Sequence, residues 1–435
     1  MEVKPGYKMT EVGVIPEDWE AGKLGRCSTF KTGPFGSALH QSDYVYDGVP
    51  VINPMQIIDG MLVPTSHMSV AEQAARRLTD FRICFGDIVI GRRGEMGRCA
   101  YVLPQQDGWL CGTGSMIIRV SRSVDARFIQ RLLASAPIIA AIENTSVGST
   151  MINLNQSTLA NLVIPLPPTK AEQEAIASTL SDVDALIESL EQLVAKKRNI
   201  KQGAMQELLT GKRRLPGFQH KAGFNDSEVG LIPEDWSLPK LGELFSFKNG
   251  LNKAKQYFGY GVPIVNYMDV YKLNRIYRRN ICGLVDVNDG EIDSFSVRKG
   301  DVFFTRTSET AEEVGLAAVL LDDVKDTVFS GFVLRARPKN DMLVDTYKAY
   351  CFSSQVVRKQ VISKSTYTTR ALTNGRILSS VSLPLPGAKL EQEAIASALA
   401  DMDVELSSLE SELSKARHLK QAMMQELLTG RIRLV

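Results

Sequence analysis

An internal duplication limits the folds that this sequence can adopt. Glu11–Trp19 reads EVGVIPEDW and Glu228–Trp236 reads EVGLIPEDW, 217 positions later. The segment KQGAMQELLTGKRRL from Lys201 returns as KQAMMQELLTGRIRL from Lys420, and EQEAIAS at 172 returns at 391; both offsets are 219. Ordered matches at nearly constant offsets indicate a duplicated unit with few net insertions. We therefore expect the 435 residues to form two copies of one architecture.

Between the matched blocks the two copies differ greatly. We therefore interpret the matched blocks as a shared scaffold and the segments between them as a variable surface. Each copy is expected to begin with a globular domain, at residues 1–168 and 216–387, rich in Gly, Pro and short β-branched runs. A proline-rich stop closes each domain, and a helical segment follows at residues 169–215 and 388–435. The predicted fold class is α/β (α+β), with two globular domains separated by two long helices. The variable surfaces are expected to read two different ligands.

Both helical segments carry apolar residues at alternating spacings of four and three, the a/d seam of a coiled coil. The first helix is acidic in its first half and basic in its second, so two such helices laid antiparallel bring opposite charges together. We predict an intramolecular antiparallel coiled coil with an internal pseudo-two-fold repeat. Alternatively, each helix packs on its own globular domain, or pairs with a second chain. The predicted seam consists of Ile176, Leu180, Val183, Ile187, Leu190, Val194, Ile395, Leu399, Met402, Leu406, Leu409 and Leu413.

Composition restricts the possible function classes. Lys and Arg number 51 against 49 Asp and Glu, and no region is strongly basic, so any contact with nucleic acid has to be local. Six dispersed cysteines without a CxxC pair, together with only four histidines, argue against a zinc site or a disulfide framework, and we predict no metal. We see neither a signal peptide nor an apolar run long enough to span a membrane, and we expect a cytoplasmic protein with reduced thiols.

Polar loops beside the predicted strands are the candidate nucleic-acid contacts. Gly91–Arg98 (GRRGEMGR) places three arginines in one loop, and arginine binds phosphate or a guanine edge, whereas its counterpart Thr305–Glu313 (TRTSETAEE) is very different. Thr145–Asn155 and Ser363–Asn374 add hydroxyl and amide groups that suit phosphates and base edges. The same residues could equally form solvated hairpins, helix caps and turns. The candidate DNA contacts are Lys31, Arg92, Arg93, Arg98, Ser149, Thr150, Asn153, Lys248, Arg306, Thr307, Ser308, Tyr367, Thr369 and Arg370.

Catalytic motifs are missing, with no Walker A, GxSxG or HExxH pattern in the sequence. Asn53–Gln56 (NPMQ) only distantly resembles the NPPF-type motif of amino-methyltransferases, and the second copy has NYMD at Asn266–Asp269, so we interpret this segment as part of the scaffold. The sequence therefore predicts a non-catalytic binding protein without a cofactor of its own. Two other functions stay open: a structural coiled-coil scaffold, and a stand-alone DNA methyltransferase or nuclease.

Three repeated blocks carry a resemblance to a known family: EVGVIPEDW, QELLTGKRRLPGF, and VIPLPPTKAEQEAIASTLSDVDALI at 163–187 with its copy at 382–406. They resemble the specificity (S) subunit of type I restriction-modification enzymes, over nearly the whole chain. The resemblance implies two target-recognition domains that each read half of a split double-stranded DNA site, with the helices as a spacer. It also implies a prokaryotic complex with two methyltransferase (M) subunits and, through them, two restriction (R) subunits. S-adenosylmethionine, ATP and Mg²⁺ would then serve adenine methylation and DNA cleavage by those partners.

Overall fold

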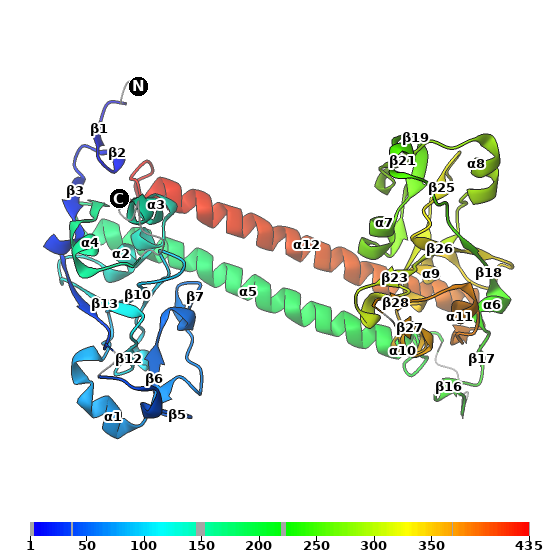
Figure 1. Ribbon diagram of the computed structural model, residues 1–435, viewed down its shortest axis with the longest axis horizontal. Helices are drawn as coiled ribbons and strands as arrows, with labels where there is room; N and C mark the ends of the chain where they lie inside the picture. The colour runs from blue at the N-terminus through cyan, green and yellow to red at the C-terminus, as the bar shows by residue number, and fades with distance from the viewer. Residues whose placement is uncertain (1–3, 36–37, 145–152, 219–222, 368, 435) are drawn as a thin grey trace. The chain divides into compact units, whose positions relative to one another are not determined.

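The computed structural model describes residues 4–35, 38–144, 153–218, 223–367 and 369–434 (Figure 1). The chain divides into two compact units, of which the first comprises residues 1–191 and 411–435 and the second comprises residues 192–410. Each unit therefore holds one globular domain together with parts of both long helices. The structural division thus differs from the sequence duplication, because the end of the second copy belongs to the unit of the first domain.

The first domain is built on a four-stranded antiparallel sheet of order β11-β10-β13-β4. The middle strands are nearly continuous apolar runs because both faces of the sheet are buried. Helices α2, α3 and α4 supply the core on one face, and a second sheet of order β12-β6-β9-β5 lies next to the other. The elements are β4 (Ser28–Thr32), β5 (Tyr44–Val45), β6 (Val49–Ile52), β9 (Ser69–Val70), α1 (Glu72–Arg77), β10 (Ile88–Gly91), β11 (Cys99–Tyr101), β12 (Leu110–Cys111), β13 (Ser115–Val120), α2 (Ala126–Leu133), α3 (Ala136–Asn144) and α4 (Gln156–Asn161).

The second domain repeats this plan with a five-stranded sheet of order β18-β26-β22-β24-β20. Its first three strands pair antiparallel as β4, β13 and β10 do, and a parallel pair, β19 with β25, takes the place of β6 with β12. The elements are β18 (Phe245–Asn249), β19 (Phe258–Val265), α7 (Tyr267–Lys272), β20 (Arg275–Ile276), β21 (Gly283–Val285), α8 (Asp289–Phe295), β22 (Val302–Thr305), β23 (Thr307–Ser308), β24 (Ala317–Leu320), β25 (Val328–Phe329), β26 (Val333–Pro338), α9 (Asp345–Cys351), α10 (Gln355–Lys364), β27 (Thr366–Tyr367), β28 (Ala371–Leu372) and α11 (Gly375–Ser379).

Short strand pairs join each domain to its scaffold helices. In the first unit, β1 pairs with β2 and β14 with β3; in the second, β15 pairs with β16 and β17 with β29. Each predicted proline stop has one proline in a strand, Pro165 in β14 and Pro386 in β29, so the repeat extends to these short pairs. The bounds are β1 (Tyr7–Thr10), β2 (Gly13–Pro16), β3 (Glu20–Lys23), β14 (Val163–Leu166), β15 (Phe224–Asn225), β16 (Ile232–Pro233), β17 (Trp236–Ser237) and β29 (Leu385–Pro386).

The two predicted long helices are α5 (Lys170–Leu208) and α12 (Lys389–Leu427), and they pair antiparallel within each unit. In the first unit, Lys420 contacts Asp184 at 2.6 Å and Arg417 contacts Glu191 at 2.6 Å. In the second unit, three basic residues of α5 contact acids of α12: Lys197 with Glu405, Arg198 with Glu410, and Lys201 with Asp403. From Arg198 to Lys201 on α5 the partner on α12 moves back from position 410 to position 403, as in an antiparallel pair. The antiparallel prediction is therefore confirmed in both units.

The predicted seam is buried most deeply at the beginning of each helix. Ile176 and Leu180 belong to the core cluster of the first domain, together with Leu427 and Leu428 from the other end of α12. The second unit repeats this arrangement with Ile395, Leu399, Leu208 and Leu209. The remaining seam residues are buried or half-buried: Val183, Ile187, Leu190, Val194, Met402, Leu406, Leu409 and Leu413. The first heptad of each helix therefore packs on a globular domain, as the alternative prediction has it, while the two helices also pair with each other.

An arginine clamp closes the first unit. Arg433, beyond the end of α12, donates two hydrogen bonds to the Asp18 carboxylate at 3.0 and 3.1 Å and also binds Glu172 of α5. Its guanidinium lies 5.9 Å from the ring centroid of Trp19. The hydrogen bonds from Arg433 lower the pKa of Asp18 below its ordinary value. These four residues, called the first clamp, join the two repeats within one unit.

The same clamp recurs in the second unit with residues of the matched blocks. Arg214 donates to both oxygens of Asp235 at 2.9 Å each and to Glu391, and its guanidinium lies 5.8 Å from the Trp236 ring. Trp236 adds a hydrogen bond from its indole Nε1 to Glu391 at 3.3 Å. The second clamp therefore explains why EDW, EQE and the arginine after LLTG are the blocks that both copies retain.

Candidate nucleic-acid interface

Four loops of the first domain converge around the backbone of Arg92. Its amide N–H donates to the carbonyl of Gly114 at 2.9 Å, and its own carbonyl accepts from the N–H of Leu154 at 2.9 Å. The Gly114 N–H in turn donates to the Asn53 side chain at 3.4 Å. We call this group of loops the first edge. It consists of residues 53–56, 91–98, 112–115 and 153–155.

The second domain forms the corresponding edge around Arg306. The Arg306 N–H donates to the carbonyl of Phe332 at 3.2 Å, and the Arg306 carbonyl accepts from the N–H of Thr373 at 3.0 Å. Arg92 and Arg306 therefore occupy equivalent backbone positions, although their loops share almost no sequence. The second edge consists of residues 266–272, 305–313, 330–332 and 371–374.

The predicted arginines of the first edge differ in accessibility. Arg92 is only 7% exposed, its Nε donates to the Leu154 carbonyl at 3.0 Å, and its guanidinium lies 5.7 Å from the Phe35 ring centroid. Burial, and next the charge of Arg93, lower the pKa of Arg92. Arg98 is half-buried and binds Glu95 at 2.6 Å. Arg92 therefore organises the loop, and its neighbours at this edge are the more accessible of the predicted contacts.

Arg93 and Asn153 are the exposed members of the predicted set at the first edge. Among the described residues, the Arg93 guanidinium has no hydrogen-bond or ion-pair partner. Ser149 and Thr150, also predicted as DNA contacts, lie outside the described residues. The first edge thus exposes the guanidinium of Arg93 and the side-chain amide of Asn153 to the solvent.

The second edge is organised by a carboxylate. Glu313 accepts hydrogen bonds from the Tyr271 hydroxyl at 2.7 Å and from the Ser308 hydroxyl at 2.9 Å, and these bonds lower its pKa. Ser308 is only 6% exposed, so this predicted DNA contact is an internal hydrogen-bond donor. Arg306 and Thr307 are half-buried, and the Arg306 guanidinium has no partner in the part of the chain that is described.

Three further predicted contacts of the second domain lie in or next to the short strand β27. Tyr367 is 64% exposed, and Thr369 and Arg370 are exposed as well. Arg370 comes within 4.0 Å of Glu309, a weak and solvated pairing. Because β27 pairs with β28, which pairs with β23, these residues belong to the same small sheet as Thr307 and Ser308.

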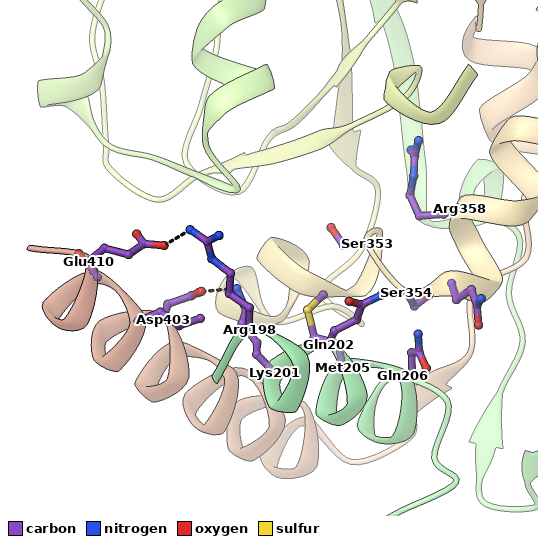
Figure 2. Close-up of a pocket in the computed structure, with 13 residues that line it drawn as sticks. Arg198, Lys201, Gln202, Met205, Gln206, Ser353, Ser354, Arg358, Asp403 and Glu410 are labelled. Carbon is purple, nitrogen blue, oxygen red and sulfur yellow. Dashed lines mark hydrogen bonds and ion pairs between the residues drawn. The ribbon is translucent and has the colours of Figure 1, made fainter. Parts of the chain in front are cut away.

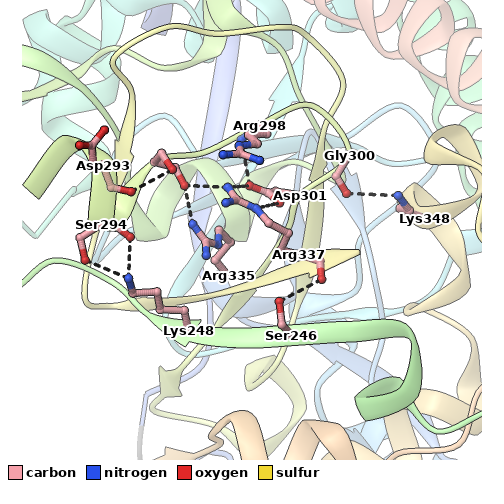
Figure 3. A network of polar contacts seen from close by, with 11 residues as sticks. Ser246, Lys248, Asp293, Ser294, Arg298, Gly300, Asp301, Arg335, Arg337 and Lys348 are labelled. Atoms are coloured by element: carbon pink, nitrogen blue, oxygen red, sulfur yellow. Dashed lines mark hydrogen bonds and ion pairs between the residues drawn. The ribbon is translucent and has the colours of Figure 1, made fainter. Parts of the chain in front are cut away.

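The predicted lysines, Lys31 and Lys248, occupy equivalent places on the outer strands β4 and β18, apart from the two edges. Each ammonium lies over a phenylalanine ring, at 5.2 Å from the Phe81 centroid and 5.0 Å from the Phe295 centroid. Lys31 also pairs with Asp80 at 3.3 Å, whereas Lys248 donates to the carbonyl and hydroxyl of a serine on α8 (Figure 3). Both lysines therefore fasten the sheet to the neighbouring subdomain.

A polar network that the sequence reading missed lies beside Lys248. Arg337 binds both oxygens of the buried Asp301, at 2.9 and 2.7 Å, while Arg335 donates to a neighbouring carbonyl (Figure 3). Burial, and next the charge of Arg337, lower the pKa of Arg335. The strand sequence VLRARP does place two arginines on one face, which is a usable signal, but it does not show that Arg335 is buried.

A cavity of about 630 Å³ lies between α5, α12, the turn before α10 and the start of α10 in the second unit (Figure 2). Its charged lining is internally paired, with Arg198 on Glu410 and Lys201 on Asp403. Arg358 points away from these pairs and donates to three loop carbonyls at 2.7 Å each, those of residues 312, 314 and 315. Arg358 therefore holds the second edge in place, a role that its sequence context did not indicate.

Neither a metal site nor a membrane span is present in the described part of the chain. No group of three or more His, Cys, Asp or Glu side chains there could hold a metal ion. Likewise, none of its helices is long and apolar enough to cross a bilayer. What the two edges offer chemically is hydrogen bonding, charge and exposed apolar groups.

Comparisons with known proteins agree with this arrangement. A family model described as the type I restriction modification DNA specificity domain matches residues 16–197 and again residues 233–416. The putative type I restriction enzyme MjaX specificity subunit of Methanocaldococcus jannaschii is 27% identical, over 98% of this chain and 97% of that protein. The type I restriction enzyme EcoKI specificity subunit of Escherichia coli K12 is 24% identical, over 88% and 82%. The crystal structure of the S subunit from M. genitalium is similar in fold, with a TM-score of 0.55 and 16% identity over 98% of this chain and 99% of that one.

Proposed function

The chain belongs to the type I restriction-modification DNA specificity family, and from this premise we propose that each edge reads one half of a bipartite duplex target. The observation that carries the proposal is the pair of equivalent backbone positions, Arg92 and Arg306, around which the side chains differ. A shared backbone places both loop sets in the same way, and different side chains select different bases.

The chemistry of the two edges supports different half-sites. At the first edge, Arg93 suits a phosphate or the O6 and N7 acceptors of guanine, and Asn153 suits adenine. At the second edge, Arg306 and the adjacent Arg370 are accompanied by the exposed carboxylate of Glu309, which can accept a hydrogen bond from the N4 amine of cytosine. The half-sites therefore require different base patterns.

The partners follow from the same premise. We propose that methyltransferase and restriction subunits assemble on this chain in a prokaryotic cytoplasm, and that α5 and α12 act as the spacer that sets the gap between half-sites. Adenine methylation and DNA cleavage, with S-adenosylmethionine, ATP and Mg²⁺, then belong to those partners. This chain supplies recognition without a catalytic step of its own.

A binding experiment on the complex with its methyltransferase subunits tests the recognition proposal. The preferred sequence is first obtained by sequencing the methylated positions in cells with and without this chain. Arg93→Ala is then expected to weaken binding to that sequence about tenfold, because one arginine contact to a phosphate or base is removed. Arg122→Ala removes the same charge from an exposed position outside the first edge and should change affinity little.

Exchange of residues 1–168 for the first domain of another family member tests whether each domain recognises its half-site independently. The exchange is expected to change one half-site and to leave the other half-site unchanged. A change in both half-sites would contradict independent reading by the two edges. If the chain bound DNA without any sequence preference in the presence of the methyltransferase subunit, the structural-scaffold alternative would be favoured. If this chain alone bound S-adenosylmethionine with micromolar affinity, the methyltransferase alternative would be favoured.

A further inference from the structure

One exposed apolar residue occupies the same place in both edges. Met55 follows the strand β6 and is 79% exposed, and Met268 follows the equivalent strand β19 and is 48% exposed. They stand in the segments NPMQ and NYMD, directly after the matched GVPVIN and GVPIVN runs. The methionine is therefore shared by two edges whose other exposed side chains differ.

The backbone that carries each methionine is fixed by its neighbours. The Asn53 N–H donates to the Gln56 side chain at 3.2 Å, and the Asn266 N–H donates to the Asp269 carboxylate at 2.8 Å. Both bonds close a capping turn at the start of a helix, which is a single 3-10 turn at 54–56 in the first domain and α7 in the second. Arg98 adds a hydrogen bond to the Pro54 carbonyl at 3.3 Å. The turn is thus held rigidly, while the methionine side chain remains in solvent.

Close packing of glycines against these turns shows that the placement is specific. A Cβ atom on Gly112 would lie 2.3 Å from the Asn53 Oδ1, and one on Gly283 would lie 2.1 Å from the Asn266 Nδ2. A side chain on either glycine would displace the asparagine side chain, so Gly112 and Gly283 leave room for the asparagine that begins each turn. A rigid turn of this kind can direct a side chain against a ligand without a loss of loop entropy on binding.

The surroundings of the two methionines favour a duplex as their ligand. Arg93 is exposed in the loop next to the Met55 turn, and an exposed cation next to an apolar tip matches a base step flanked by phosphates. In the second domain, Tyr267 precedes Met268 and stacks on Tyr271 with ring centroids 5.7 Å apart. The residues around the two methionines therefore differ, whereas the methionine itself is the same in both edges. A contact that is common to both half-sites requires such a shared residue.

We propose that Met55 and Met268 are apolar wedges, each of which presses into the base stack of one half-site beside the adenine that the methyltransferase partner extrudes. The proposal rests on the proposed function, because it places the methionines on the DNA that the two edges read. Apolar side chains inserted at a base step reduce stacking there, and extrusion of a base requires that stacking be lost. An unbranched methionine adapts to different steps, so it contacts both half-sites without selecting their sequence.

The test uses the complete complex of this chain with its methyltransferase subunits and its target duplex. 2-Aminopurine replaces the methylated adenine of one half-site at a time, because its fluorescence rises when it leaves the base stack. Met55→Ala is expected to reduce that rise several-fold in the first half-site alone and to weaken binding about tenfold, and Met268→Ala should act in the same way in the second half-site. Met55→Leu, which keeps an apolar side chain of similar volume, should retain most of the signal.

Matched controls use exposed methionines outside the edges. Met9→Ala and Met342→Ala remove side chains that are 59% and 43% exposed, and both variants should keep the wild-type fluorescence and affinity. If Met55→Ala and Met268→Ala behave like these controls while the wild-type complex binds its target specifically, the wedge proposal is overturned. A changed recognition sequence in either variant would also overturn it, because the methionine would then be a base reader. Loss of sequence-specific binding by the wild-type complex would overturn the proposed function itself.

Discussion

The central sheets of the two domains have the same plan but carry different residues at one buried position. Ile117 and Arg335 occupy the same place, each opposite a lysine of the neighbouring strand. Ile117 is fully buried in an apolar cluster, whereas Arg335 donates to the Ser296 carbonyl at 2.5 Å and lies 5.2 Å from the Phe329 ring centroid. Its Nε is buried without a hydrogen-bond partner among the described residues. The comparison teaches that the sheet accepts an interior charge where an adjoining loop supplies a carbonyl oxygen.

The largest effect in a comparison of the two units is expected at their clamps. Arg214→Ala leaves the carboxylate of Glu391, which is 1% exposed, without its charge partner, and stranding a buried charge costs about 3–5 kcal/mol. Arg433→Ala should cost less, because the Arg433 side chain is 32% exposed and that of Arg214 only 11%. The measurement is the free energy of unfolding in guanidinium, followed by intrinsic fluorescence.

A double variant separates the charge from the packing at the second clamp. Glu391→Gln combined with Arg214→Ala removes the stranded charge and should recover part of the lost free energy. If Arg214→Ala alone lowered the free energy of unfolding by less than about 1 kcal/mol, the clamp would be a solvated surface pair. Equal losses for Arg214→Ala and Arg433→Ala would show that the difference in exposure has no consequence.

Exchange of the residue that differs between the two sheets is expected to have the next largest effect. Ile117→Arg puts a charge into an apolar cluster, and we expect a loss of about 2–4 kcal/mol in the free energy of unfolding. Arg335→Ile removes a buried charge and should be neutral or stabilising by about 1 kcal/mol. Thermal unfolding of both variants measures this, and a strong destabilisation by Arg335→Ile would show that the arginine is needed where the isoleucine is not.

The helix ion pairs provide a smaller contrast. Lys197→Glu in the second unit and Lys420→Glu in the first each break a pair of 2.6 Å and should cost about 0.5–1 kcal/mol, because both pairs are partly exposed. The reversed pair Lys197→Glu with Glu405→Lys should restore the stability. The losses should shrink in high salt, since screening weakens surface charges. Losses that do not depend on salt would show that packing rather than charge is responsible.

The smallest expected effect concerns the pH dependence at the first clamp. Because Arg433 lowers the pKa of Asp18 in the folded protein, this carboxylate stabilises the fold above its unfolded pKa of about 4 and loses that contribution as the pH falls through the lowered value. Asp18→Asn should therefore reduce the loss of stability between neutral and acidic pH. Thermal melts across that pH range, with wild type as reference, provide the measurement, and an unchanged pH profile would contradict the assigned cause.

The sequence predicted the parts of the fold that depend on local pattern. The heptad spacings located α5 and α12. The charge segregation of the first helix indicated the kind of pairing that Lys201 and Asp403 now show. These features were predictable because each is set by residues close together in the chain, or by a repeated pattern that both helices share.

The candidate site was predictable only to the level of loops. The loop after β10 was identified, but the burial of Arg92 depends on the carbonyl of Leu154, 62 positions away, and on the ring of Phe35. The hydroxyl group of Ser308 predicts a DNA contact, and its hydrogen bond to Glu313 depends on how the loop folds. The exposed candidates, such as Arg93 and Tyr367, stay predictions, since direct contact with DNA depends on the duplex as well as on the protein.

The first clamp has a consequence for the order in which the chain is made. Arg433 contacts Asp18 across 415 positions, and Leu427 and Leu428 complete the core cluster of the first domain. On the ribosome, the first unit therefore acquires its last core residues only once position 428 has emerged, whereas the second unit already has all of its residues once position 410 has emerged. The domain that is synthesised first is thus the last to be finished, and until then the apolar residues that Leu427 and Leu428 cover lack part of their packing.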